Sequence, residues 1–207
     1  MLTIYKNIIW DFDGVIIDSQ AIKDYGFTTI FEGHPPGKID AFLAFHHANG
    51  GMTRFVKIRY FFEQLLQQPI TEEEVQLLAR RFSEITTQLL IKPELLIADS
   101  LDFIRQYHTQ YRMHIVSASE EQELRLVART QGIDQYFVSI QGSPTVKKEN
   151  VQKVLAANQY VLADTCLVGD AINDYEAATL NGIDFYGYNQ PKLKGKGAGY
   201  IESFAKL

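Results

Sequence analysis

Short apolar runs recur along the chain, each bounded by polar residues or glycines. Within a run the apolar residues do not alternate with polar ones, which is typical of parallel strands buried on both faces of a sheet. Five runs have the length of a strand: Asn7–Trp10, Met113–Ser117, Tyr136–Ile140, Thr165–Val168 and Ile183–Tyr186. The pattern therefore predicts a parallel sheet at the centre of the molecule.

Between several of these runs, apolar residues recur at every third or fourth position, as they do on one face of a helix. One such stripe begins at Leu101 and follows Asp99 and Ser100, either of which could cap the helix. Two further stripes are Leu124–Ala128, which precedes a helix-ending Gly132, and Val151–Leu155. Strands that alternate with helices predict an α/β fold with a Rossmann-like parallel sheet flanked by helices.

The long interval between the first two predicted strands contains only helical patterns. Its strongest helix spans Thr71–Leu90, where Thr71 and Glu74 match the capping-box pattern ahead of an apolar stripe. A second helical stretch covers roughly residues 54–66. These patterns divide the chain into a helical insert and a discontinuous α/β core, with the insert at residues 16–95 and the core at residues 1–15 and 96–207.

The composition changes this picture little, because 46% hydrophobic and 22% charged residues in a chain of 207 are ordinary for a globular protein. A net charge of −5 argues against nucleic acid or an anionic membrane as the main partner, since both favour basic patches. The single cysteine, Cys166, excludes an internal disulfide and is typical of a reducing compartment. The N-terminal segment does not resemble a signal peptide, and no apolar stretch approaches the ~20 residues that span a membrane. We therefore expect a cytoplasmic protein.

Polar side chains follow the predicted strands at the points where the strands end. Ligands of open parallel sheets bind beyond the carboxyl ends of the strands, so these side chains are expected to meet at one rim. The residues at these points are, in strand order, Asp11 and Asp13, then Ser117, Ala118 and Ser119, then Lys147 and Lys148, and last Asp170 and Asp174, and all but Ala118 are polar.

The residue types at this rim indicate phosphate chemistry. Several carboxylates would repel one another unless a hard cation lay among them, and oxygen ligands without histidine or thiolate suit Mg²⁺. A lysine and a serine hydroxyl nearby provide a positive charge and a hydrogen bond for an anion. Metal, lysine and serine together are suited to phosphoryl transfer.

Four stretches in this order, DFDGVIIDS, IVSAS, the lysine of SPTVKKEN, and VGDAINDYEAA, resemble the ordered motifs of the haloacid dehalogenase superfamily. The insert after the first motif resembles the helical C1 cap of that superfamily. The similarity extends over essentially the whole chain and is greatest to the phosphoglycolate phosphatase and β-phosphoglucomutase branch. It implies a Mg²⁺-dependent phosphatase that acts on a small soluble phosphomonoester, as a monomer or small homo-oligomer.

The resemblance also implies roles for the aspartates. Asp11 would be the nucleophile that forms an aspartyl-phosphate. Asp13 would protonate the leaving alcohol, take a proton from the hydrolytic water and offer its backbone carbonyl to the metal. Asp170 would bind the metal through its side chain, and Asp174 would do so directly or through a water. The implied metal ligands are therefore Asp11, Asp13, Asp170 and Asp174.

The remaining implied site residues bind phosphate or substrate. Ser117 would hydrogen-bond the transferred phosphoryl group, while Gly14 and Ala118 would lie against the substrate. Many relatives have Lys-Pro in the third motif, where this chain has two adjacent lysines. Lys147 is the expected site lysine because of the residues that follow it, and Lys148 is the alternative.

Several other polar residues have two interpretations. Arg54 follows a glycine-bearing loop in the insert, so it could bind a second anionic group of the substrate or be an exposed arginine without such a role. The adjacent His46 and His47 are not expected to face the same surface of a helix, so they do not predict a paired metal site. Residues predicted to act only as caps or turns are Asp18, Ser19 and Ser119, and residues 191–200 are predicted to form a surface loop.

Other activities are compatible with parts of this pattern. A sugar-phosphate mutase would have the same motifs, and a non-catalytic phosphate-binding module such as a receiver domain also places aspartates on a parallel sheet. A receiver, however, has its acceptor on a later strand and no large helical cap. A dehalogenase normally lacks the second aspartate, here Asp13. A phosphonate-cleaving relative needs a cap lysine, and Lys23, Lys38 and Lys57 stand in no recognised setting for it.

Overall fold

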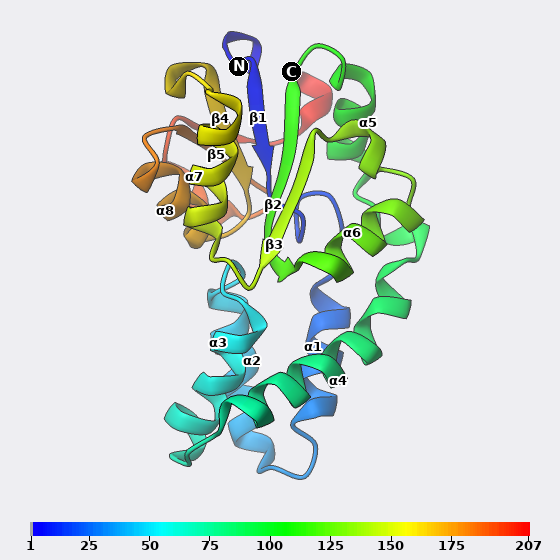
Figure 1. Cartoon of the computed structure of the whole chain (residues 1–207), viewed down its shortest axis with the longest axis vertical. Coiled ribbons are helices and arrows are strands. Elements are labelled where there is room, and N and C mark those ends of the chain that lie inside the picture. The colour runs from blue at the N-terminus through cyan, green and yellow to red at the C-terminus, as the bar shows by residue number, and fades with distance from the viewer. Residues whose placement is uncertain (1) are drawn as a thin grey trace.

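The computed structural model describes residues 2–207 and has a parallel sheet as its centre (Figure 1). Six strands lie in the order β3-β2-β1-β4-β5-β6, and every neighbouring pair is parallel. Their bounds are β1 Asn7–Trp10, β2 Arg112–Glu120, β3 Ser139–Ser143, β4 Thr165–Gly169, β5 Asp184–Tyr188 and β6 Gly199–Ile201. The predicted α/β fold is confirmed.

Two parts of the strand prediction are wrong. β3 begins at Ser139 rather than Tyr136, because residues 134–136 form a 3₁₀ turn before the strand. The segment predicted as a surface loop contains a 3₁₀ turn at Pro191–Leu193 and then the start of β6, which pairs with β5. β6 has only three residues, so it has no apolar pattern long enough to detect.

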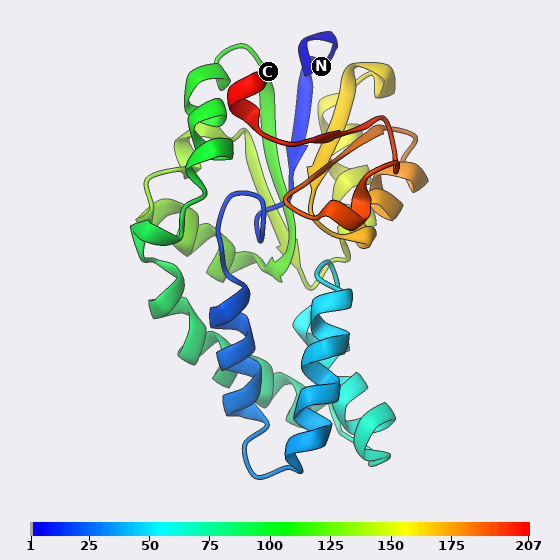
Figure 2. The same ribbon diagram turned by 180° about the vertical axis from the view of Figure 1, so that it is seen from behind.

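Helices cover both faces of the sheet (Figures 1 and 2). One face packs against α5, Ala98–Tyr107, and α6, Glu121–Thr130, while the other packs against α7, Lys147–Asn158, and α8, Ile172–Leu180. Successive residues of β1 point to opposite faces, so Ile8 joins the first cluster and Ile9 joins the second. Both faces of β1 are thus buried, as its unbroken apolar run predicts.

The predicted caps of α5 are wrong. Ile97, not Asp99 or Ser100, precedes the first helical residue. The Ser100 hydroxyl donates to the backbone oxygen of Val15 at 2.5 Å, and Asp99 accepts hydrogen bonds from Ser203 and from two backbone N–H groups near the C-terminal end of the chain. Both side chains therefore join distant segments, which local sequence does not reveal.

The insert between β1 and β2 is helical, as predicted, and lies beyond the carboxyl ends of the strands (Figures 1 and 2). Its aromatic core includes Phe27, Phe31, Phe42, Phe61 and Phe82. The capping box at the start of α4 is confirmed. The helices are α1 Gln20–Ile30, α2 Pro36–Ala48, α3 Arg54–Arg59, a π-helical continuation at Tyr60–Leu66, and α4 Glu72–Leu90.

Two chain segments connect the insert to the core, and they run side by side. The backbone N–H of Asp18 donates to the oxygen of Leu95 at 2.8 Å, and that of Ile97 donates to the oxygen of Ile16 at 2.9 Å. These bonds hold the two connections together as a short antiparallel ladder. Both covalent connections of the insert therefore leave the core at the same place.

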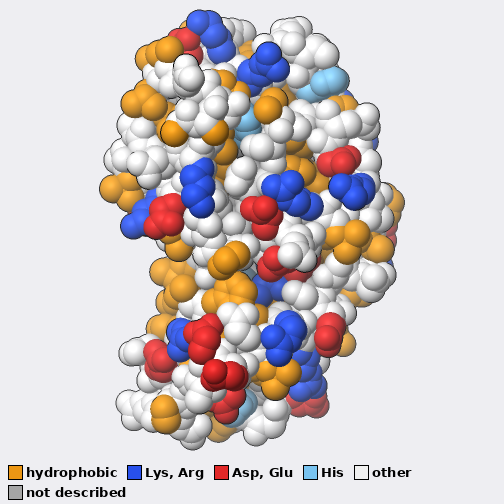
Figure 3. Space-filling model, in the orientation of Figure 1, with side chains coloured by type: hydrophobic (Ala, Val, Ile, Leu, Met, Phe, Trp, Pro, Cys, Tyr) orange, Lys and Arg blue, Asp and Glu red, His pale blue; other side chains and the backbone are white. Residues whose placement is uncertain are grey.

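The surface carries charges of both signs. Acidic and basic side chains are interspersed over the face shown in Figure 3. Among residues 2–207, no helix has the length and apolar character to cross a membrane.

Candidate active site

With the exception of the exposed Lys148, the polar residues predicted to meet at one rim of the sheet lie there, on the side that faces the insert. A cavity of about 220 Å³ lies there, lined by residues of both parts of the chain. The core contributes Asp11, Asp13, Gly14, Ser117, Ala118 and Asp170, and the insert contributes Lys23, His46, Gly50 and Gly51. The site is therefore formed between the sheet and the insert.

Asp11, Lys147 and Asp174 form a buried charge cluster. Lys147 Nζ lies 2.6 Å from Asp11 Oδ1 and 2.5 Å from Asp174 Oδ1. The other oxygen of Asp174 accepts the backbone N–H of Ala171 at 2.9 Å, which ties this carboxylate to the start of α8. Lys148 is exposed. Of the two candidate lysines, the structure thus places Lys147 among the carboxylates.

The cluster carries more negative than positive charge. Oxygens of Asp11, Asp170 and Asp174 all lie within 4.8 Å of one another, and Lys147 is the cation among them. Burial and the nearby Asp174 raise the pKa of Asp11 to about 7, although Lys147 opposes that rise. Burial and Asp11 likewise raise the pKa of Asp170 well above its ordinary value. Burial lowers the pKa of Lys147, but the two carboxylates that it contacts outweigh burial and raise it.

These carboxylates fit a hard divalent cation. The donor set consists of oxygens alone, which are the ligands that Mg²⁺ prefers, and a cation would offset the repulsion that raises the carboxyl pKa values. Among residues 2–207 this is the one group of acidic, histidine or cysteine side chains close enough together to hold a metal ion.

Asp13 has different partners from the other aspartates. Its carboxylate accepts hydrogen bonds from Ser19 at 2.6 Å and Ser119 at 2.8 Å, and it lies 2.5 Å from the ammonium of Lys23. Burial alone would raise the pKa of Asp13, but the Lys23 ammonium and the hydrogen bonds of the serines outweigh it and hold the pKa well below its usual range. Asp13 is therefore an ionised carboxylate in this structure. Ser117 donates to the same carboxylate at 3.3 Å.

These contacts correct the predicted roles of two serines. Ser19 precedes α1 but makes no capping bond with its side chain, and α6 is capped by the carboxylate of Glu120 rather than by Ser119. Lys23 was missed as a site residue. It lies in the first turn of α1, shortly after the first motif, and that position was the available signal.

Gly14 allows a carboxylate to approach the backbone. Its φ is +74°, and a Cβ at this position would lie 1.9 Å from Asp170 Oδ2. Gly169, on β4, likewise leaves room for an aspartate, because a Cβ at this position would lie 2.4 Å from the Cβ of Asp174. The space beside Gly14, expected to accommodate substrate, is thus occupied by the side chain of Asp170.

Arg54 is buried, so the prediction of an exposed arginine is wrong. Its guanidinium lies 2.8 Å from Glu123 of α6, donates to Ser83 of α4 at 2.5 Å and stacks over the ring of Phe82 at 4.6 Å. Arg54 and Glu123 are 5% and 7% exposed. The pair therefore links the insert to the core.

The two adjacent histidines approach the same acidic residue, although they were expected to face different surfaces of their helix. His47 Nε2 lies 2.9 Å from Asp24 Oδ1, and His46 Nε2 lies 3.6 Å from the same atom. Asp24 belongs to α1 and lies within reach of both histidine rings, which belong to α2. His46 is buried and also contacts Lys57, with its Nδ1 2.7 Å from Lys57 Nζ.

The buried pair between Arg54 and Glu123 leads to a first prediction. We expect Glu123→Gln to lower the free energy of unfolding by about 3 kcal/mol, because it leaves the buried guanidinium without its carboxylate. Urea unfolding measures the change. Asp102→Asn is the matched control, because Asp102 pairs with Arg105 on the exposed surface at 3.6 Å. Loss of this exposed ion pair is expected to change the free energy of unfolding by less than about 0.5 kcal/mol. Equal effects of Glu123→Gln and Asp102→Asn would contradict the prediction.

Comparisons with known proteins are consistent with this arrangement. The model of a family described as haloacid dehalogenase-like hydrolase matches residues 8–188. No curated protein matches the chain significantly. Many solved structures do, at low sequence identity.

Three of these structures cover nearly the whole chain. β-Phosphoglucomutase from Clostridium difficile has a TM-score of 0.80 at 15% identity, over 98% of this chain and 93% of that one. A predicted phosphoglycolate phosphatase from Haemophilus somnus has a TM-score of 0.79 at 18% identity, over 100% and 97%. CbbY from Rhodobacter sphaeroides, solved in complex with phosphate, has a TM-score of 0.77 at 14% identity, over 98% and 96%. At sequence identities this low, the structural similarity establishes a common fold and nothing further.

Proposed function

The chain belongs to the haloacid dehalogenase-like hydrolase family, and from this premise we propose that it is a Mg²⁺-dependent phosphatase of a small phosphomonoester. The observation that carries the proposal is the buried cluster in which Lys147 holds Asp11 beside Asp170 and Asp174. A carboxylate that is fixed by an ammonium and faces a cavity is suited to attack phosphorus. The neighbouring carboxylates supply the metal site that a phosphate dianion requires.

In the proposed first step, a carboxylate oxygen of Asp11 attacks the phosphorus of the substrate. A bond forms between that oxygen and phosphorus, the bond from phosphorus to the ester oxygen breaks, and the leaving alcohol takes up a proton. Lys147 favours the ionised, nucleophilic form of Asp11 by lowering its pKa. Asp11, Asp170 and Asp174 would hold the Mg²⁺, whose charge would reduce the repulsion between the carboxylate and the phosphate.

In the proposed second step, water attacks the phosphorus of the aspartyl-phosphate, and the bond to Asp11 breaks. Asp13 takes the proton of that water, a role that requires the ionised carboxylate that Lys23 and two serines stabilise. To protonate the leaving alcohol in the first step, Asp13 would have to be protonated, and the contact with Lys23 opposes this. The ammonium must therefore move away when substrate binds, or another donor must supply that proton.

The proposal is tested by release of inorganic phosphate from a panel of phosphomonoesters, including sugar phosphates, phosphorylated hydroxy acids and nucleotides. We expect release with Mg²⁺ and loss of at least ~100-fold of the rate in EDTA, because buried like charges then face the substrate without a cation. Equal rates with Mg²⁺ and EDTA would contradict the metal requirement. Isomerisation of a sugar phosphate without release would instead support a mutase on the same residues.

A further inference from the structure

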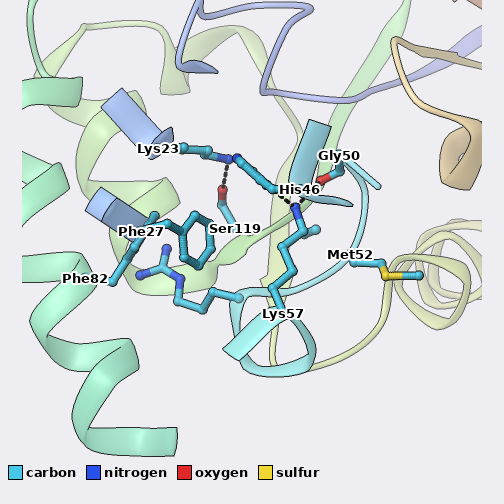
Figure 4. Close-up of a pocket in the computed structure, with 10 residues that line it drawn as sticks. Lys23, Phe27, His46, Gly50, Met52, Lys57, Phe82 and Ser119 are labelled. Carbon is cyan, nitrogen blue, oxygen red and sulfur yellow. Dashed lines mark hydrogen bonds between the residues drawn. The ribbon is translucent and has the colours of Figure 1, made fainter. Parts of the chain in front are cut away.

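A second, smaller cavity adjoins the active-site cavity on the side of the insert (Figure 4). Its volume is about 20 Å³, and Lys57 of α3, Phe27 of α1 and Phe82 of α4 contribute to its walls. The two cavities have four lining residues in common, Lys23, His46, Gly50 and Ala118. A substrate bound at Asp11 would therefore extend toward this second cavity.

Lys57 is the unusual residue of the second cavity. It is 2% exposed, and its Nζ lies 2.7 Å from His46 Nδ1 and 3.5 Å from the backbone oxygen of Gly50. In the described part of the chain it forms no ion pair, whereas Lys23 pairs with Asp13 and Arg54 pairs with Glu123. Burial and the nearby Lys23 lower the pKa of Lys57 to about 7. A buried ammonium without a counter-ion is costly, so an anion beside it would be stabilising.

His46 accepts a hydrogen bond from Lys57 and so fixes the position of the ammonium. Burial and the adjacent Lys57 lower the pKa of His46 to about 2, so the ring is neutral. Because Nδ1 accepts from the Lys57 ammonium, we assign the ring proton to Nε2. Nε2 is buried without a hydrogen-bond partner, and Asp24 Oδ1 at 3.6 Å lies beyond hydrogen-bond reach. This N–H group faces Asp24 on the opposite side of the ring from Lys57, so the Lys57 ammonium is the donor available to an anion in the second cavity.

We propose that Lys57, held in place by His46, binds a second anionic group on the substrate and thereby selects phosphomonoesters whose alcohol part carries a carboxylate or a second phosphate. The inference rests on the proposed function, because the reacting phosphate is taken to bind at Asp11. Arg54, the residue that the sequence offered as a candidate for this role, is already paired with Glu123. Lys57 is the specificity residue in its place.

The size of the cavity favours the smaller of the two anions. About 20 Å³ is room for about one water-sized probe. A carboxylate has three heavy atoms, and a phosphoryl group has four. A carboxylate therefore needs less rearrangement of Phe27 and Phe82 to enter.

Binding of non-hydrolysable phosphonates tests this inference without any turnover. Three probes share a phosphonate and a two-carbon chain that ends in a carboxylate, a second phosphonate or a methyl group. Calorimetric titration with Mg²⁺ present is expected to show at least ~10-fold tighter binding of the carboxylate probe than of the methyl probe, since charge-assisted hydrogen bonds are strong. The diphosphonate is expected to fall between them, and the order of the two anionic probes distinguishes a carboxylate from a phosphate subsite.

Lys57→Met tests the assignment to one residue, because methionine has a similar length and no charge. We expect the preference for an anionic tail to fall below ~3-fold in this variant and to stay unchanged in Lys38→Met, an exposed lysine of the insert. Wild-type protein that binds all three probes equally, or binds none, would overturn the inference, as would a preference that survives Lys57→Met. If Lys57→Met does not fold, the binding of the three probes to the wild-type protein still shows whether the site prefers an anionic tail. Absence of phosphate release would overturn the proposed function alone.

Discussion

Asp11→Asn is expected to abolish phosphate release, with a loss of at least ~10⁴-fold in kcat, because an amide cannot act as the nucleophile that a carboxylate is. The same change removes one negative charge from a buried cluster of three carboxylates and one lysine. We therefore expect the variant to be no less stable than the wild type when metal is removed. Loss of activity together with retained stability would separate a chemical role from a structural one.

Two measurements on Asp11→Asn are needed, phosphate release in Mg²⁺ and thermal unfolding in EDTA. Asp40→Asn is the control, since Asp40 is an exposed aspartate of α2 that undergoes the same change of side chain. It is expected to retain the wild-type rate within ~2-fold, as an exposed substitution distant from the site. Phosphate release by Asp11→Asn at more than a tenth of the wild-type rate would contradict the assignment of the nucleophile.

Lys147→Met is expected to have the second largest effect and to act on both activity and stability. Activity falls by ~10³-fold, because removal of a positive charge beside the reacting group withdraws electrostatic stabilisation of the transition state. The free energy of unfolding at pH 8 in EDTA falls by about 3–5 kcal/mol, because two buried carboxylates lose their counter-ion. Lys148→Met is the control, since Lys148 is the adjacent lysine and is exposed.

The loss of stability in Lys147→Met is expected to depend on pH. The pKa of Asp11 is about 7 in the folded protein, against 3.8 for an ordinary aspartate, and removing Lys147 raises it further. A group whose pKa is raised on folding stabilises the protein at low pH, and this contribution is lost as pH rises through the folded-state value. The difference in stability between the variant and the wild type should therefore be smaller at pH 5 than at pH 8. A difference that is independent of pH would contradict the placement of the charges.

Sequence patterns were sufficient where structure is local or repetitive. The apolar run at Asn7–Trp10 predicted a strand buried on both faces, and Thr71 with Glu74 predicted the start of α4. The convergence of strand ends also followed from the sequence, because parallel strands bring their carboxyl ends to one rim. The aspartates after β1 and β4 meet there as expected.

Contacts between distant segments could not be predicted in this way. Ser119 was expected to cap a helix, but its hydroxyl instead contacts Asp13, 106 residues away. The setting of Lys57 depends on the packing of four helices of the insert, which determines that the lysine faces inward beside His46. A single sequence gives helix faces, but it does not give the angles at which the helices pack.

The paired connections of the insert also have a consequence for how the chain folds. β1 and β2 pair in the sheet with Ile8 opposite Met113, so the whole insert must be bridged before these strands can meet. Contacts so far apart in sequence slow folding, because the entropy of the closed loop is lost first. A folded insert holds its own ends together through the bridge between Ile17 and Leu96. The helices of the insert thus shorten the effective loop, and their early formation would speed the pairing of the central strands.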